Sequence, residues 1–131
     1  MIAFLKIEEQ VNSIFETFAE EHHFRLIITD YEVEMTNNVC KILISTDRYY
    51  PELRMKLINP RKAERNIYEI NKIMQLHNNH KYSPSFGSNK DSSDEARISL
   101  LNIFLNWLNI YCHDSIKGNF DKLDNLGYWN L

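Results

Sequence analysis

Histidines are the first side chains in this chain that could hold a metal ion. His22 and His23 are adjacent, and His77 and His80 stand three residues apart. Adjacent side chains diverge on a helix or strand, and the chain has neither paired cysteines nor the histidine spacings typical of zinc sites. We therefore expect no metal site and no cofactor.

Nucleophilic catalysis would require a serine or cysteine that a neighbouring base activates. Cys40 and Cys112 lie in apolar patterns on different predicted elements, which indicates two buried, reduced thiols, although a disulfide between them stays open. The glycines Gly87, Gly118 and Gly127 are isolated, so they cannot build a phosphate-binding or dinucleotide-binding loop. The sequence predicts that the protein is not an enzyme.

Carboxylates alternate along one stretch of the chain, at Asp30, Glu32 and Glu34. Paired carboxylates can serve acid–base catalysis, but this alternation is typical of the solvated face of a strand. The same spacing would also present three acidic groups to a basic partner. We keep solvation and partner binding as alternatives and take these residues as candidates for binding.

The segment Asp47-Arg48-Tyr49-Tyr50 is the other candidate for binding, because tyrosine and arginine are enriched in the hot spots of protein interfaces. In one interpretation the segment anchors a partner. In the other, Asp47 and Arg48 order a turn while one tyrosine joins the core.

Charge is unevenly distributed along the chain. Residues 1–34 contain eight acidic and two basic side chains, whereas residues 41–72 contain eight basic and four acidic ones. The net charge of -3 and the pI near 5.9 argue against binding to nucleic acid or to an anionic membrane. The acidic segment either is simply solvated or faces a basic partner.

The elements that must position these residues follow from hydrophobic spacing. Residues 4–21 have the period of an amphipathic helix, and residues 24–28 and 31–35 alternate with opposite parity, which requires a bulge or turn near Thr29 and Asp30. Asn37-Asn38 predicts a tight turn before a strand over residues 39–45. In that register facing residue numbers sum to 75, so Val33 lies opposite Ile42 and Glu34 lies opposite Lys41.

The second half of the chain predicts one more strand and three helical segments. The strand covers residues 53–57, and Asn59-Pro60 is interpreted as the start of a helix that ends near Leu76. Residues 78–91 have the composition of a mobile internal loop. Ser92 and Glu95 form a capping-box pattern before an apolar helix over residues 98–112 that should be buried on most sides, and a short helix or turn follows around residues 120–126.

These elements predict one domain over residues 1–131, of the α+β class, with a small antiparallel sheet of three to four strands and helices packed on one face. The apolar run over residues 98–112 is shorter than the roughly 20 residues of a membrane span. The first residues lack the features of a signal peptide. We therefore expect a cytoplasmic protein that does not contact a membrane.

Four passages carry a resemblance to a known class of proteins. They are the helix that ends near His22, the passage Phe24-Arg25-Leu26-Ile27-Ile28, the passage Ser45-Thr46-Asp47-Arg48-Tyr49-Tyr50-Pro51, and Asn119-Phe120-Asp121-Lys122-Leu123 after the closing apolar helix. In these the chain resembles small bacterial immunity proteins of polymorphic-toxin and contact-dependent inhibition systems. The resemblance implies a one-to-one inhibitor that binds and blocks a cognate toxin domain, such as a nuclease, in the cytoplasm.

Two functions from different classes therefore stay open. The first is an immunity-type protein without catalysis, in which the partner-binding residues are Asp30, Glu32, Glu34, Asp47, Arg48, Tyr49 and Tyr50. The second is a small-ligand-binding or regulatory domain with a pocket between the sheet and the helices.

Overall fold

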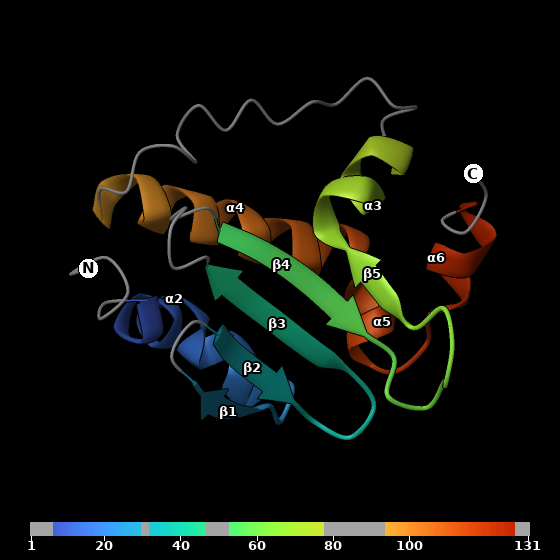
Figure 1. Cartoon of the computed structure of the whole chain (residues 1–131), viewed down its shortest axis with the longest axis horizontal. Helices are drawn as coiled ribbons and strands as arrows, with labels where there is room; N and C mark the ends of the chain where they lie inside the picture. Colours follow the sequence, from blue (N-terminus) through green and yellow to red (C-terminus); the bar gives the residue numbers. More distant parts are fainter. Residues whose placement is uncertain (1–6, 30–31, 47–52, 78–93, 128–131) are drawn as a thin grey trace.

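Five antiparallel strands form one sheet in a computed structural model, which describes residues 7–29, 32–46, 53–77 and 94–127. The strands are β1 (Arg25–Ile28), β2 (Glu32–Thr36), β3 (Lys41–Thr46), β4 (Leu53–Ile58) and β5 (Ile67–Glu69). They follow one another across the sheet in chain order (Figure 1). The predicted α+β class is confirmed, with five strands instead of three to four.

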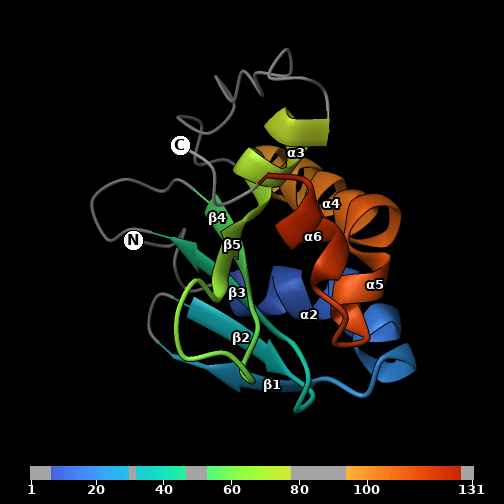
Figure 2. The same ribbon diagram turned by 90° about the vertical axis from the view of Figure 1, so that its right-hand side faces the viewer.

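The described helices gather on one side of this sheet (Figure 2). They are α2 (Ile7–Glu21), α3 (Ile70–His77), α4 (Asp94–Tyr111), α5 (His113–Ile116) and α6 (Asp121–Asn125). Helix α2 contacts β2, α3 contacts β4 and β5, and α4 contacts β4 and α2. Within the described residues, every helix falls short of the length and apolarity needed to cross a bilayer.

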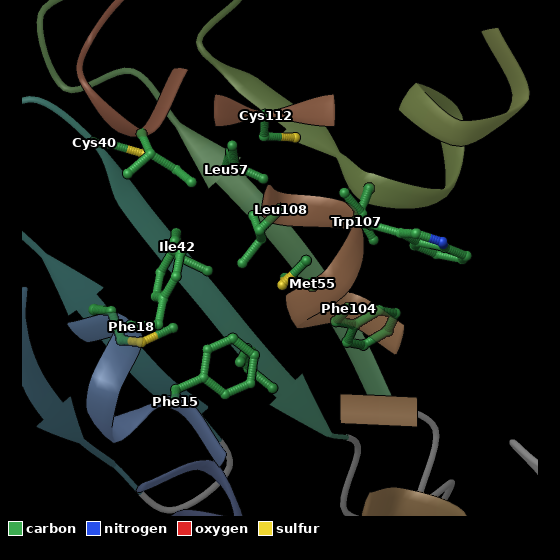
Figure 3. Packing of buried hydrophobic residues seen from close by; sticks show 14 of the residues in the cluster. Phe15, Phe18, Cys40, Ile42, Met55, Leu57, Phe104, Trp107, Leu108 and Cys112 are labelled. Carbon is green, nitrogen blue, oxygen red and sulfur yellow. The ribbon is translucent and has the colours of Figure 1, made fainter. Parts of the chain in front are cut away.

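The core lies between the helices and the inward face of the sheet. Because side chains alternate along a strand, Val33, Ile42 and Leu57 point toward the helices, and all three are fully buried. Phe15 and Phe104 meet them from α2 and α4 (Figure 3). Burying one such side chain stabilises the fold by about 1.5–3 kcal/mol, so this layer holds the sheet in place.

The end of α2 turns the chain into β1. His23 adopts a φ of 59°, the backbone N–H of Phe24 donates to the Ala19 carbonyl at 2.8 Å, and that of His23 donates to the Glu20 carbonyl at 3.3 Å. This pair of bonds is the Schellman ending of a helix. The Phe24 ring stacks on Phe18, with ring centroids 5.7 Å apart, so the turn is also fixed by an apolar contact.

The hairpin between β2 and β3 corrects the predicted register. Val33 pairs with Ile44 and Thr36 pairs with Lys41, so facing residue numbers sum to 77 and the expected pairs Val33–Ile42 and Glu34–Lys41 are wrong. The turn is centred one residue later than expected, since Asn38, with a φ of 77°, is its first residue. A shift of two residues keeps each side chain on its face, which is why the predicted core positions hold.

Asn37 fixes this turn through its side chain. Its Oδ1 accepts hydrogen bonds from the backbone N–H groups of Val39 and Cys40, at 3.2 and 3.0 Å, and its Nδ2 donates to the carbonyl of His22 at 2.9 Å. The last bond ties the hairpin to the end of α2.

We expect Asn37→Ala to lower the free energy of unfolding by about 1–3 kcal/mol, because two backbone donors and one carbonyl lose their partner. Urea unfolding followed by circular dichroism measures the change. Asn38→Gly is the matched control, since glycine adopts a positive φ without strain and should leave stability unchanged or slightly higher. Equal losses in the two variants would contradict the assigned role of the Asn37 side chain.

The predicted helix from Asn59-Pro60 to Leu76 is wrong over its first half. Asn59 Oδ1 accepts from the N–H of Arg61 at 3.1 Å, and the Asn59 N–H donates to the Asn66 carbonyl at 2.8 Å, so residues 59–66 form a loop. The chain then pairs with β4 as β5, in which Tyr68 is buried between two exposed neighbours. Only from Ile70 onward is it a helix, namely α3.

Later elements agree with the predictions except for the exposure of α4. Helix α4 begins at Asp94, and α6 confirms the last short helix, whereas Ser92 and the predicted loop 78–91 lie outside the described residues. The expectation that the apolar helix is buried on most sides is wrong. Ile98, Ile103 and Ile110 are exposed on the side of α4 that also carries its asparagines.

Candidate protein-binding face

The side of the sheet opposite the helices is formed by every second residue of each strand, and we call it the open face. Apart from Leu26 and Ile28 at the edge, its described inward-facing neighbours are buried. Thr36 lies on this face but is buried, and the other side chains on it are exposed or half-buried. They are Arg25, Ile27, Glu32, Glu34, Lys41, Leu43, Ser45, Arg54, Lys56, Ile58, Ile67 and Glu69. An antiparallel sheet with one solvated face is common, so the composition of that face decides what it can bind.

Two carboxylates and two basic side chains of the open face lie on different strands. Strand β2 presents Glu32 and Glu34, while β4 presents Arg54 and Lys56. In the register, Glu32 is followed across the sheet by Ser45 and then Arg54, so the acidic and basic strands are two strand spacings, or roughly 10 Å, apart. Charges of the opposite sign lie next to both strands, because Arg25 and Lys41 flank the acidic strand and Glu69 pairs with Lys56.

Apolar side chains lie between and beside these charges. Ile27 of β1 pairs with Glu34, and Leu43 of β3 lies on its other side, between Glu34 and Lys56. Ile27 is 45% exposed. A face with apolar side chains beside charges of both signs can offer a partner both apolar contact and charge complementarity.

The predicted binding residues did not include these apolar members of the open face. Their signal is present, because Leu43 stands where strict alternation in the strand 41–45 would place a polar residue. Ile27 likewise continues an apolar run with Leu26 and Ile28, so it breaks the alternation of its strand.

The predicted binding residues are placed as follows. Glu32 is exposed and Glu34 is half-buried, and both lie on the open face. The remaining predicted residues lie outside the described residues; they are Asp30, Asp47, Arg48, Tyr49 and Tyr50. The structure thus brings together two of the predicted carboxylates with apolar side chains that were not predicted.

Acidic residues of the first helix belong to a different surface. Glu9, Glu16 and Glu20 are exposed on the outer side of α2, and α2 packs on the helix side of the sheet. Glu32 lies on the other side of the sheet, so it and these three residues face opposite sides of the molecule. One flat partner surface cannot contact both groups.

A polar hollow of about 600 Å³ lies at the end of the sheet, between the loop 59–66 and the segment 117–124. Tyr68 donates its hydroxyl to Asp124 Oδ1 at 2.7 Å, and Lys62 Nζ lies 3.6 Å from Asp124 Oδ2. Arg61 donates to the carbonyl of Gly118, whose φ of 97° ends α5. The ligand-binding alternative places its pocket between the sheet and the helices. That layer is filled with buried side chains, and the hollow lies beside it.

The cysteines and two of the histidines in the described part of the chain have pKa values shifted by burial. Burial raises the pKa of Cys40 and of Cys112 to about 12, so both thiols stay protonated and unreactive near neutral pH. The pKa of His22 and that of His77 are lowered, chiefly by burial. Over the described residues no three histidine, cysteine or carboxylate side chains come together as metal ligands.

Comparisons with family models, with curated proteins and with solved structures found no match to this chain.

Proposed function

We propose that this chain is an immunity-type protein that acts without catalysis in the cytoplasm and neutralises a cognate bacterial toxin domain. Its binding surface in this proposal is the open face. The observation that carries the proposal is the display of Glu32 and Glu34 beside the exposed side chain of Ile27 on a sheet face that none of the described helices covers. Carboxylates would meet basic groups of the toxin, and the isoleucine would supply apolar contact.

A nuclease is the toxin that best matches this chemistry. Enzymes that bind nucleic acid carry lysine and arginine at the phosphate-binding surface, so an acidic strand can occupy that surface. Arg54 and Lys56 of β4, with Glu69 beside Lys56, leave that side of the face with a net positive charge, so a basic partner surface would favour β2 over β4.

The proposal is tested by affinity purification of the tagged protein from its native cells, at low and at moderate salt. The expected result is one stoichiometric partner with a basic surface. Glu32→Lys/Glu34→Lys should lose this partner, whereas Glu16→Lys/Glu20→Lys, which changes charge equally on the far side of the molecule, should retain it. Loss in both variants, or in neither, would contradict the assignment to the open face.

With the purified partner, the kinetics provide a sharper test. Reversing the charge at Glu32 and Glu34 should lower the association rate by about 10-fold to 100-fold at low salt, because long-range steering is lost. Surface plasmon resonance over a salt series measures this rate. An unchanged association rate at low salt would eliminate these carboxylates as the steering groups.

A ligand-binding domain is the second candidate, and the polar hollow favours it. Arg61, Lys62 and Lys117 line this hollow together with Asp121 and Asp124, so basic groups outnumber acidic ones and its ligand would be a small carboxylate or phosphate. A panel of such compounds should raise the melting temperature of the protein, and Lys117→Ala should abolish the rise. If the panel leaves the melting temperature unchanged, the ligand-binding candidate falls.

A further inference from the structure

The outer edge of β1 combines two features that natural edge strands usually avoid. β1 is the first strand of the sheet, so among the described strands only β2 pairs with it (Figure 1). Ile27 and Ile28 are 45% and 48% exposed. Edge strands are commonly protected by lysine, proline or a bulge, yet within β1 only Arg25 is charged.

The two isoleucines are exposed on opposite faces of the strand. Ile27 belongs to the open face, whereas Ile28 pairs with the buried Val33 and therefore points to the helix side. It is nevertheless half exposed, because the sheet ends at β1. A strand added beside β1 would cover both side chains at once.

The pairing of β1 with β2 determines which backbone groups face the free edge. The Thr29 N–H donates to the Glu32 carbonyl at 3.0 Å, which makes Thr29 and Glu32 a hydrogen-bonded pair. Such pairs alternate along an antiparallel ladder, so Ile27 is also bonded to β2. The N–H and C=O groups of Leu26 and Ile28 consequently point away from β2, toward the edge.

We infer that β1 pairs antiparallel with β1 of a second copy of this chain, across a twofold axis that passes beside Ile27. In this register Leu26 lies opposite the partner's Ile28, Ile28 lies opposite the partner's Leu26, and the two Ile27 residues face each other. The edge groups of Leu26 and Ile28 then form four backbone hydrogen bonds.

Self-complementarity is the reason for choosing a second copy as the occupant. The register that satisfies the edge groups also places Ile27 against the partner's Ile27 on the open face, and Leu26 against the partner's Ile28 on the helix side. If the register shifted by one residue, the backbone N–H and C=O groups of Leu26 would face the partner's Ile27. The backbone groups of Ile27 already bond to β2 and could not pair with them. A register centred on Leu26 would need the N–H of Phe24, which the Ala19 carbonyl already accepts.

The twofold axis of this dimer is perpendicular to the sheet. The two sheets would join into one of ten strands, with both helix layers on one side and both open faces on the other. This inference goes beyond the proposed function, and its test needs no toxin. Because the dimer covers Ile27, a toxin domain that contacts Ile27 would compete with the second copy.

The first test is the mass of the protein in solution, measured by sedimentation at concentrations from about 1 to about 300 µM, since one short strand predicts a weak dimer. The wild type should approach twice its 15.7 kDa at the upper end. Ile27→Lys should stay near 15.7 kDa, because it places two like charges at the axis. Ile67→Lys is the matched control, with the same 45% exposure on the opposite edge, and should dimerise like the wild type.

The second test is a cross-link that reports the register. Cα atoms in a non-hydrogen-bonded antiparallel pair lie about 4.5 Å apart, which is within reach of a disulfide. Ile27→Cys should therefore form a covalent dimer under mild oxidation, and Ile67→Cys should not. The native thiols are buried and should not interfere. A wild type that stays monomeric throughout, or an Ile27→Cys variant that links no faster than Ile67→Cys, would overturn the inference.

Discussion

Replacement of Phe15 by alanine is expected to lower the free energy of unfolding by about 3–5 kcal/mol, which is a large part of the stability of a typical domain. Phe15 has no exposed surface, and its ring meets Phe18 edge to face with centroids 6.0 Å apart. Both rings point from α2 toward the sheet (Figure 3). The alanine would leave a cavity where α2 covers β2.

Urea unfolding measures this loss, and Ile110→Ala is the control. Ile110 is also a large apolar residue on a helix, but it is 58% exposed, so its truncation should cost little. The denaturant slope should be the same in both variants if only stability changes. Equal midpoints for Phe15→Ala and Ile110→Ala would contradict the packing of α2 on the sheet.

Alkaline pH is expected to destabilise the protein through its two buried thiols. Burial raises the pKa of Cys40 and of Cys112 from 9.0 to about 12. Between these values the unfolded chain has released its thiol protons and the folded chain has kept them. The unfolded state thus binds fewer protons, so the free energy of unfolding falls as pH rises, by roughly 1 kcal/mol per pH unit for each thiol.

Urea unfolding between pH 8 and pH 12 measures this slope, and other groups also contribute to it. Comparison with Cys40→Ala/Cys112→Ala isolates the thiols, because the remaining groups are common to both proteins. The double variant should be less stable at neutral pH but lose less stability at high pH. Parallel curves for the two proteins would show that the thiols titrate normally in the fold.

Much of the fold was predictable because alternation and helical spacing report which face of an element is buried. The helix up to Glu21 and the buried positions Val33, Ile42 and Ile44 follow from that pattern. Register depends on the turn instead, and two consecutive asparagines leave open which of them occupies the turn. Asn37 uses its side chain to cap the turn and leaves the positive φ to Asn38, a distinction that spacing does not carry.

Strand β5 was missed for a different reason. The residues Ile67, Ile70 and Met74 have helical spacing, yet Tyr68 is the buried residue at the start of this segment. Its position is decided by a tertiary contact, since its hydroxyl donates to Asp124 and its ring stacks on Phe120, 5.1 Å away. Local periodicity cannot contain information about a partner more than 50 residues distant.

The sequence was sufficient to predict the two carboxylates of the candidate site. It was not sufficient to predict which other residues share their face. Glu32 and Glu34 alternate with buried residues, so their placement on the outer face follows from strand geometry. The acidic residues of α2 were expected to join them, but net charge along a sequence does not say on which side of a sheet a helix packs. Ile27 completes the face only because β1 lies beside β2.

The order of the strands has a consequence for how the chain folds. Each strand pairs with its neighbour along the chain, so the sheet can grow by successive hairpins with short loop closures. Docking of α4 onto α2 requires a much longer loop closure. The hydrogen bond that Arg97 Nε donates to Gln10 Oε1 joins residues that are 87 positions apart in the chain. We therefore expect the sheet to assemble early and the helix layer to close late, and until it closes the inward face of the sheet stays exposed to other chains.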